Sequence, residues 1–141
     1  MKDIEKAKEL LHSGDYTCVV CKGEELYTST LRGVKPLVQW YDADRNFKDF
    51  SAADKVVGKA TAVLYALLKI KSVYARVVSK AALEVLKTHK IIVEYDTLVE
   101  NIINRQGDDI CPFEKAVLDV ADTQIAYEVI RNKMRELNIS L

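Results

Sequence analysis

The sequence predicts an α/β protein, a three-layer α/β/α sandwich built on a mixed β-sheet. Two observations carry this prediction: a strand-turn-strand pattern lies near the N-terminus, and helical and strand patterns alternate after it. Such alternation favours parallel pairing of the later strands, with helices on both faces of the sheet. With 141 residues, 49% of them apolar and 30% charged, the chain has the size of a single domain, residues 1–141.

The N-terminal part of the chain predicts a helix followed by a β-hairpin. Apolar residues recur at helical spacing from Ile4 to Leu11, and Gly14 follows where that helix would end. Residues 17–22 are rich in β-branched side chains, a polar turn comes next, and residues 26–30 predict the returning strand. We expect this hairpin to form one side of the sheet.

A short helix, a loop and a central helix are expected after the hairpin. Pro36 can begin the short helix because its fixed φ suits the first helical position, and residues 42–49 predict a polar loop. The clearest apolar stripe, residues 60–68, predicts a central helix that begins near Lys55 or Gly58. The aromatic residues expected to cover the core are Trp40, Phe47 and Phe50.

The second half of the chain predicts a repeated strand-helix order and a helical end. The expected elements are a strand at 73–78, a helix at 81–87 with Ser79 as its N-cap, and a strand at 91–95. Residues 97–100 have capping-box spacing and predict a helix that Gly107 can end. Pro112 can begin another helix, and residues 113–137 predict one long helix or two helices with a break near Asp122.

Charge and cysteine content narrow the classes of function. The chain carries 21 basic and 21 acidic residues, so no overall positive field favours general nucleic-acid binding. Charges occupy residues 1–6, where a signal peptide needs an apolar run, and no stretch has the length of a membrane span. Three cysteines, an odd number, favour reduced thiols. We therefore expect a cytoplasmic protein without a membrane partner.

Two segments resemble the signatures of a known family. Residues 54–60, Asp-Lys-Val-Val-Gly-Lys-Ala, and residues 111–114, Cys-Pro-Phe-Glu, are similar to those of an uncharacterised prokaryotic family of zinc-less proteins with the cytidine-deaminase-like fold. The predicted order of helices and strands is similar to that fold over most of the chain. The resemblance implies a deaminase-like sandwich and assigns no activity.

The resemblance also implies that no catalytic zinc is held. Working zinc deaminases open one helix with His-x-Glu and the next with Pro-Cys-x-x-Cys, which supply three zinc ligands and a proton-shuttling carboxylate. At the corresponding helix starts this sequence has Gly-Lys-Ala at 58–60 and Ser-Lys-Ala at 79–81. We therefore expect neither zinc-dependent deamination nor any other cofactor.

The same two helix starts predict an anion site. Ligands in open α/β sheets bind beyond the carboxyl ends of the parallel strands, where helix N-termini present free N–H groups. Lys59 and Lys80 lie in the first turns of the two helices, Gly58 allows close approach to the backbone, and Ser79 can donate a hydroxyl hydrogen bond. The competing interpretation is that both lysines are simply solvated.

Further residues are candidates for ligand contact at the same sheet edge. Asp54 and Lys55 precede the central helix and either contact a ligand or only cap and solvate that helix. Tyr95 ends a predicted parallel strand, although an aromatic residue there more often packs. Arg32 follows the hairpin, where a surface loop is the simpler interpretation.

Cys111 is the best candidate nucleophile. It precedes Pro112 at the predicted N-cap of a helix, where the helix dipole favours thiolate. The neighbouring Asp108 and Asp109 act against this, and a packing role is the competing interpretation. Glu114 is a candidate general acid or base, with helix capping as its alternative.

The other cysteine residues and both histidine residues are expected to have structural roles. Cys18 and Cys21 form a Cys-x-x-Cys, but residues three apart on a strand point to opposite faces of the sheet and cannot chelate one metal ion or form a disulfide. His12 and His89 lie near predicted helix C-termini and have no partner at metal-ligand spacing.

The sequence thus supports two classes of function. The first is a protein that binds a small anionic ligand, nucleotide-like if the resemblance holds, either as a metal-free enzyme that uses Cys111 or as a non-catalytic binder. The second is an interaction or homo-oligomerisation module that uses an apolar surface around Trp40. The residues alone leave open whether the protein is an enzyme.

Overall fold

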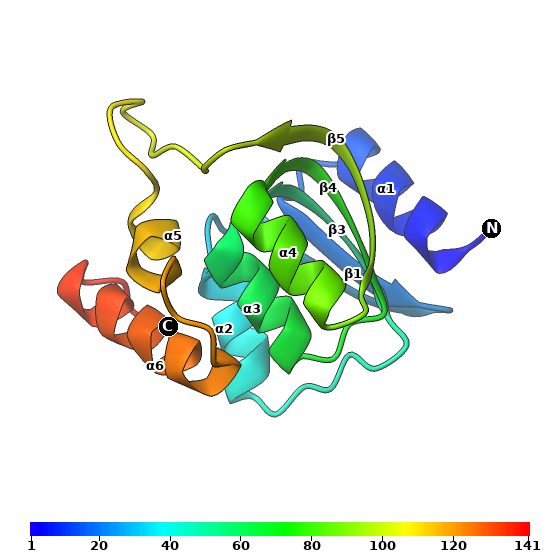
Figure 1. Ribbon diagram of the computed structural model, residues 1–141. Helices are drawn as coiled ribbons and strands as arrows, with labels where there is room; N and C mark the ends of the chain where they lie inside the picture. Colours follow the sequence, from blue (N-terminus) through cyan, green and yellow to red (C-terminus); the bar gives the residue numbers. More distant parts are fainter.

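The computed structural model describes residues 1–141 and folds them into six helices and one five-stranded sheet (Figure 1). In chain order the elements are α1 (Asp3–Ser13), β1 (Cys18–Lys22), β2 (Glu25–Ser29), α2 (Lys35–Asp42), β3 (Ser51–Val57), α3 (Lys59–Leu67), β4 (Ser72–Ser79), α4 (Lys80–Thr88), β5 (Ile92–Val99), α5 (Pro112–Val117) and α6 (Thr123–Glu136). None of the six helices combines the length and apolar character that crossing a membrane requires.

The sheet is mixed, as the sequence predicts. Its strand order is β2-β1-β3-β4-β5. Strand β1 is antiparallel to β2 and to β3, whereas β3, β4 and β5 are parallel to one another. Each parallel pair is joined through a helix, α3 or α4, as parallel connections require. The carboxyl ends of three neighbouring strands therefore meet at the same edge of the sheet.

Helices cover the sheet on both faces and form the three layers (Figure 1). Helix α1 packs on one face, against β1, β3 and β4. Helices α3 and α4 pack side by side on the other face, α2 contacts α3, and α5 and α6 pack against α3. The larger core lies on the α3 side, and a smaller cluster lies under α1. The predicted α/β sandwich is confirmed.

Strand β3 is the element that the sequence pattern did not reveal. It begins with Ser51-Ala52-Ala53-Asp54, a segment without the β-branched residues that mark strands. All four residues are buried, between β1 and β4 and beneath helices on both faces. Small side chains are useful there because both helical layers can approach the strand closely. The following helix begins at Lys59 with Gly58 as its N-cap, one of the two starts that the apolar stripe suggested.

The helix predicted from the capping-box spacing at residues 97–107 is wrong. Those residues begin inside β5, which pairs with β4 through Val99, so sheet pairing overrides the local helical signal. A loop then follows, closed by a bridge between Ile103 and Ile110 and by a turn in which Gly107 has φ +76°. The predicted break near Asp122 is confirmed, because that carboxylate caps α6 by accepting the N–H groups of the next helical residues.

The buried cysteines behave as strand geometry predicts. Cys18 faces α3, where its Sγ lies 3.1 Å from the hydroxyl of Tyr65. Cys21 faces α1 and donates to the carbonyl of Asp3 at 3.2 Å. All three cysteines are free thiols. The pair in the Cys-x-x-Cys therefore lies on opposite faces of the sheet and packs in two different cores.

The other residues expected to be structural have contacts within the protein, although both histidines are exposed. His12 Nε2 lies 3.2 Å from the Tyr74 hydroxyl, and His89 Nδ1 lies 2.9 Å from a carbonyl one helical turn back. Phe47 and Phe50 are buried in the larger core, as expected. Trp40 is partly buried and packs edge-on against Phe47.

Candidate functional site

A pocket of about 350 Å³ opens at the carboxyl end of β3. Its walls come from the start of β1, the segment between β2 and α2, the end of β3, the first turn of α3, and α5 with the loop before it. The pocket therefore lies where an α/β sheet is expected to bind ligands. Six predicted site residues line it: Arg32, Asp54, Lys55, Gly58, Cys111 and Glu114.

Glu114 is the most constrained of these residues. Its side chain is 1% exposed. Oε1 accepts the backbone N–H of Lys59 at 2.9 Å and the hydroxyl of Ser79. Oε2 accepts the backbone N–H of Ile102 at 2.5 Å. One carboxylate from α5 thus joins the first turn of α3, the N-cap of α4 and the loop after β5.

This carboxylate occupies the place where the sequence predicted a bound anion. The N–H group at the start of α3 and the hydroxyl at the start of α4 both donate to it, and the helix dipole favours a negative charge there. Gly58 makes room for this arrangement, since a Cβ on it would lie 3.1 Å from Ile102 Cγ1 and 3.4 Å from Glu114 Oε1. The carboxylate of Glu114 is therefore the negative group at the starts of α3 and α4.

The two lysines predicted to share a ligand point to different places. Lys59 Nζ donates to the carbonyl of Leu118 at 2.8 Å. Lys80 Nζ lies 2.7 Å from Glu100, and the two side chains are 63% and 75% exposed. Neither lysine lines the pocket. The structure therefore does not bring their ammonium groups together in one cleft.

Ser79 and Tyr95 also lie outside the pocket lining. Ser79 caps α4 by accepting the N–H of Ala82 and donates its own hydroxyl hydrogen to Glu114. Tyr95 lies within β5, which continues to Val99, and its side chain is 40% exposed. Strand β5 therefore ends at Val99, four residues after Tyr95, where the sequence pattern indicated its end. Tyr95 for this reason does not lie at the carboxyl edge of the sheet.

A second buried carboxyl group, that of Asp54, faces α3. Its Oδ2 accepts the hydroxyl of Tyr65 at 2.7 Å, and the same hydroxyl contacts Cys18. Burial raises the pKa of Asp54 to about 7, although the hydrogen bond from Tyr65 acts in the opposite direction. Burial, and then the charge of Asp54, raises the pKa of both Cys18 and Tyr65. Near neutral pH, Asp54 is thus the member of this trio that changes charge.

Two basic residues line the pocket without an acidic partner. Neither Arg32 nor Lys55 has a carboxylate within 4.0 Å of its charged nitrogens; they share this with most of the 21 basic side chains, of which five form ion pairs, but these two line the pocket. Arg32 is exposed and Lys55 is half-buried. Positive charge is therefore available to a ligand at this pocket.

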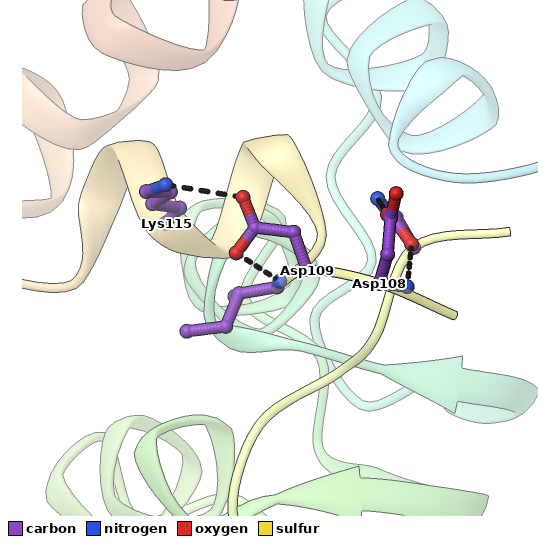
Figure 2. A network of polar contacts seen from close by, with 5 residues as sticks. Asp108, Asp109 and Lys115 are labelled. Atoms are coloured by element: carbon purple, nitrogen blue, oxygen red, sulfur yellow. Dashed lines mark hydrogen bonds and ion pairs between the residues drawn. The ribbon is translucent and has the colours of Figure 1, made fainter. Parts of the chain in front are cut away.

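Cys111 forms part of the pocket wall at the N-cap of α5. It is half-buried, and its side chain makes no capping hydrogen bond. The loop before it is fixed by its own polar contacts: Asp109 accepts the N–H of Ile110 and pairs with Lys115 at 3.2 Å, as Figure 2 shows. These contacts link the loop to α5, which has Cys111 as its N-cap residue and Glu114 in its first turn.

Tyr65 and Ile102 are site residues that the sequence analysis did not identify. Tyr65 lies within the apolar stripe of α3, where a buried hydroxyl always needs a partner, and this need was the available signal. Ile102 contributes through its backbone N–H, which no side-chain pattern can indicate. No group of three or more His, Cys, Asp or Glu side chains lies close enough together to hold a metal ion.

Fold and pocket together define an α/β sandwich with a ligand-sized pocket at a parallel sheet edge. Residues 6–134 match the family model TM1506, described as a domain of unknown function (DUF1893). The chain belongs to this family. The prediction of an uncharacterised family is thereby confirmed.

The solved structure of one family member agrees with this assignment. The crystal structure of a DUF1893 family protein from Thermotoga maritima is similar with a TM-score of 0.84 and 28% sequence identity, over 96% of this chain and 91% of that chain. The dCMP deaminase from the cyanophage S-TIM5, in apo form, gives a TM-score of 0.43 and 14% identity, over 66% of this chain and 93% of that chain. No curated protein matches the sequence.

Replacing Glu114 by Gln should destabilise the protein strongly. The variant keeps one acceptor oxygen but sets an amide NH₂ against a backbone N–H, so one buried donor loses its acceptor and the helix starts lose their anion. We expect a loss of about 2–4 kcal/mol in the free energy of unfolding, measured by urea denaturation. The control is Glu128→Gln on the exposed face of α6, which should change it by less than about 0.5 kcal/mol. Equal effects of the two substitutions would contradict the role of Glu114.

The pH dependence of stability should depend on Asp54. Because its folded pKa is about 7, above the ordinary 3.8, its contribution to stability is fully present below about pH 4 and is lost as the pH rises through 7. Asp54→Asn removes this pH-dependent loss of stability, because an Asn side chain does not ionise. Between about pH 4 and pH 8 the free energy of unfolding of the wild type should therefore fall, relative to that of the variant, by at most about 4 kcal/mol. Parallel curves for the two proteins, or a similar divergence for the exposed Asp119→Asn, would refute this assignment.

Proposed function

We propose that the pocket at the carboxyl end of β3 binds a small anionic molecule. The observation that carries this proposal is the pair of basic residues, Arg32 and Lys55, that line the pocket without a carboxylate partner. The negative charge of Glu114 is already matched by three donors, and Asp54 is partly protonated near neutral pH. The ionised groups left to interact with a ligand are thus mainly positive.

Pocket size and lining support a compact ligand with an apolar body. A volume of about 350 Å³ lies within the range of small-molecule sites, about 300–1,000 Å³. Leu31, Val34 and Phe113 are among the apolar residues of the wall. The nucleotide-like identity of the ligand, and a prokaryotic family without catalytic zinc, rest on the sequence resemblance to the cytidine-deaminase-like fold.

Binding without catalysis is the favoured form of this function. Glu114, the candidate acid or base, uses both oxygens for contacts that hold the fold. A metal-free enzyme would instead rely on the thiol of Cys111, which lies on the pocket wall. Free thiols suit the reducing cytoplasm, where we place the protein.

An interaction module, with a second copy as its partner, is the alternative function. The observation that favours it is the sheet edge at β5, which has no further strand beside it and exposes the apolar side chains Ile92, Tyr95 and Leu98. The aromatic cluster expected for this role is less suitable, because Phe47 and Phe50 are buried.

The binding function predicts that anions stabilise the protein through Arg32 and Lys55. A thermal-shift screen with inorganic phosphate, sugar phosphates and nucleoside monophosphates should raise Tm for at least one of them. Arg32→Ala and Lys55→Ala should each lower the affinity for that ligand about tenfold or more, because each removes one charge-assisted hydrogen bond. Lys87→Ala, an exposed lysine on α4, is the control and should bind normally. No shift with any anion, or equal losses in all three variants, would refute the proposal.

A further inference from the structure

Two carboxyl groups line the pocket, and they differ in how much hydrogen-bonding capacity remains. Glu114 accepts three donors within the protein. Asp54 accepts one short hydrogen bond at Oδ2, from Tyr65 at 2.7 Å. Its Oδ1 accepts a long hydrogen bond of 3.4 Å from the N–H of Val56, and the backbone N–H of Lys55 and the Cys18 thiol also lie near this carboxyl group. Oδ1 is therefore a buried acceptor with capacity left for a ligand.

The hydrogen bonds of the trio show which oxygen of Asp54 is the less engaged. The Tyr65 hydroxyl donates to Asp54 Oδ2, and the Cys18 thiol lies 3.1 Å from the Tyr65 oxygen and also near the Asp54 carboxyl group. Asp54 Oδ2 is therefore the oxygen that the Tyr65 hydroxyl occupies. Asp54 is only 9% exposed and lines the pocket, and Oδ1 is the oxygen of this residue with more capacity left for a ligand donor.

We propose that Asp54 determines the ligand class: its Oδ1 accepts a hydrogen bond from an N–H group at the buried end of the ligand. This inference rests on the proposed anion-binding function. The ligand then carries an amine, amidine or ring N–H at one end and a carboxylate or phosphate at the other. A carboxylate without such a donor leaves the buried acceptor unpaired, which costs affinity.

Binding of such a ligand depends on the protonation of Asp54. An N–H donor favours the ionised carboxylate, so binding near neutral pH releases a proton and weakens in acid. Burial keeps the neighbouring thiol and phenol neutral by raising the pKa of each. The titratable and charged groups that face Asp54 or share its pocket are Cys18 from β1, Tyr65 from α3, Arg32 before α2, Lys55 from β3, and Cys111 and Glu114 at α5.

A matched pair of probes tests this proposal by isothermal titration calorimetry. 4-Amidinobenzoate has an anionic end and an N–H end, and 4-acetylbenzoate has nearly the same shape without the N–H donor. At about pH 8 the wild type should bind the amidine at least about tenfold more tightly, and this preference should fall at about pH 5.5. Asp54→Asn should lose the preference and retain affinity for 4-acetylbenzoate.

The control is the second Asp–Tyr pair of the fold. Tyr74 donates to Asp96 on the α1 face of the sheet, away from the pocket, so Asp96→Asn should keep the full preference. Equal affinity for both probes in the wild type, or a preference that survives Asp54→Asn, overturns the role of Asp54. The anion site itself stands in those cases if Arg32→Ala weakens both probes. Failure of both probes to bind overturns the two proposals together.

Discussion

The buried carboxylate of Glu114 is the interaction on which the arrangement of this molecule depends. It accepts donors from three segments that are far apart in the sequence, at Lys59, Ser79 and Ile102. Two of these donors lie at the starts of neighbouring helices, where free donors and the helix dipole demand a negative partner. A glycine at position 58 allows the close approach. Removing this charge would leave donors unpaired where α3, α4 and the loop after β5 meet α5.

The position of the pocket follows from the same constraint. Since α5 is held against the starts of α3 and α4, the helix tips are closed from within, and the open space lies beside them at the end of β3. In the proposed binding mode Arg32 and Lys55 meet the charge of the ligand, and Asp54 and Cys18, which line the pocket, both contact Tyr65. The carboxyl group that holds the helix starts and the one proposed to recognise a ligand thus belong to different residues of one pocket wall.

Much of this could be predicted from the sequence wherever local patterns and tertiary packing agree. The opposed faces of Cys18 and Cys21 and the break at Asp122 are examples, because strand geometry and helix capping act locally. Strand β3 could not be recognised from the sequence, because its small residues are suited to close packing against helices on both faces of the sheet and do not show the β-branched pattern of a strand. The helix expected at 97–107 failed because pairing with β4 outweighs a capping signal. The two helix starts correctly predicted a negative charge beside them. No sequence pattern showed that the carboxylate of Glu114 would supply this charge.

Amide hydrogen exchange, measured by NMR on the wild type and on Glu114→Gln, tests the central claim most directly. The account predicts strong protection of the N–H groups of Lys59 and Ile102 in the wild type. In the variant their exchange should be faster than that of amides in the middle of β4, which rely on sheet hydrogen bonds alone. Unchanged protection at both positions would show that the carboxylate does not hold these segments together.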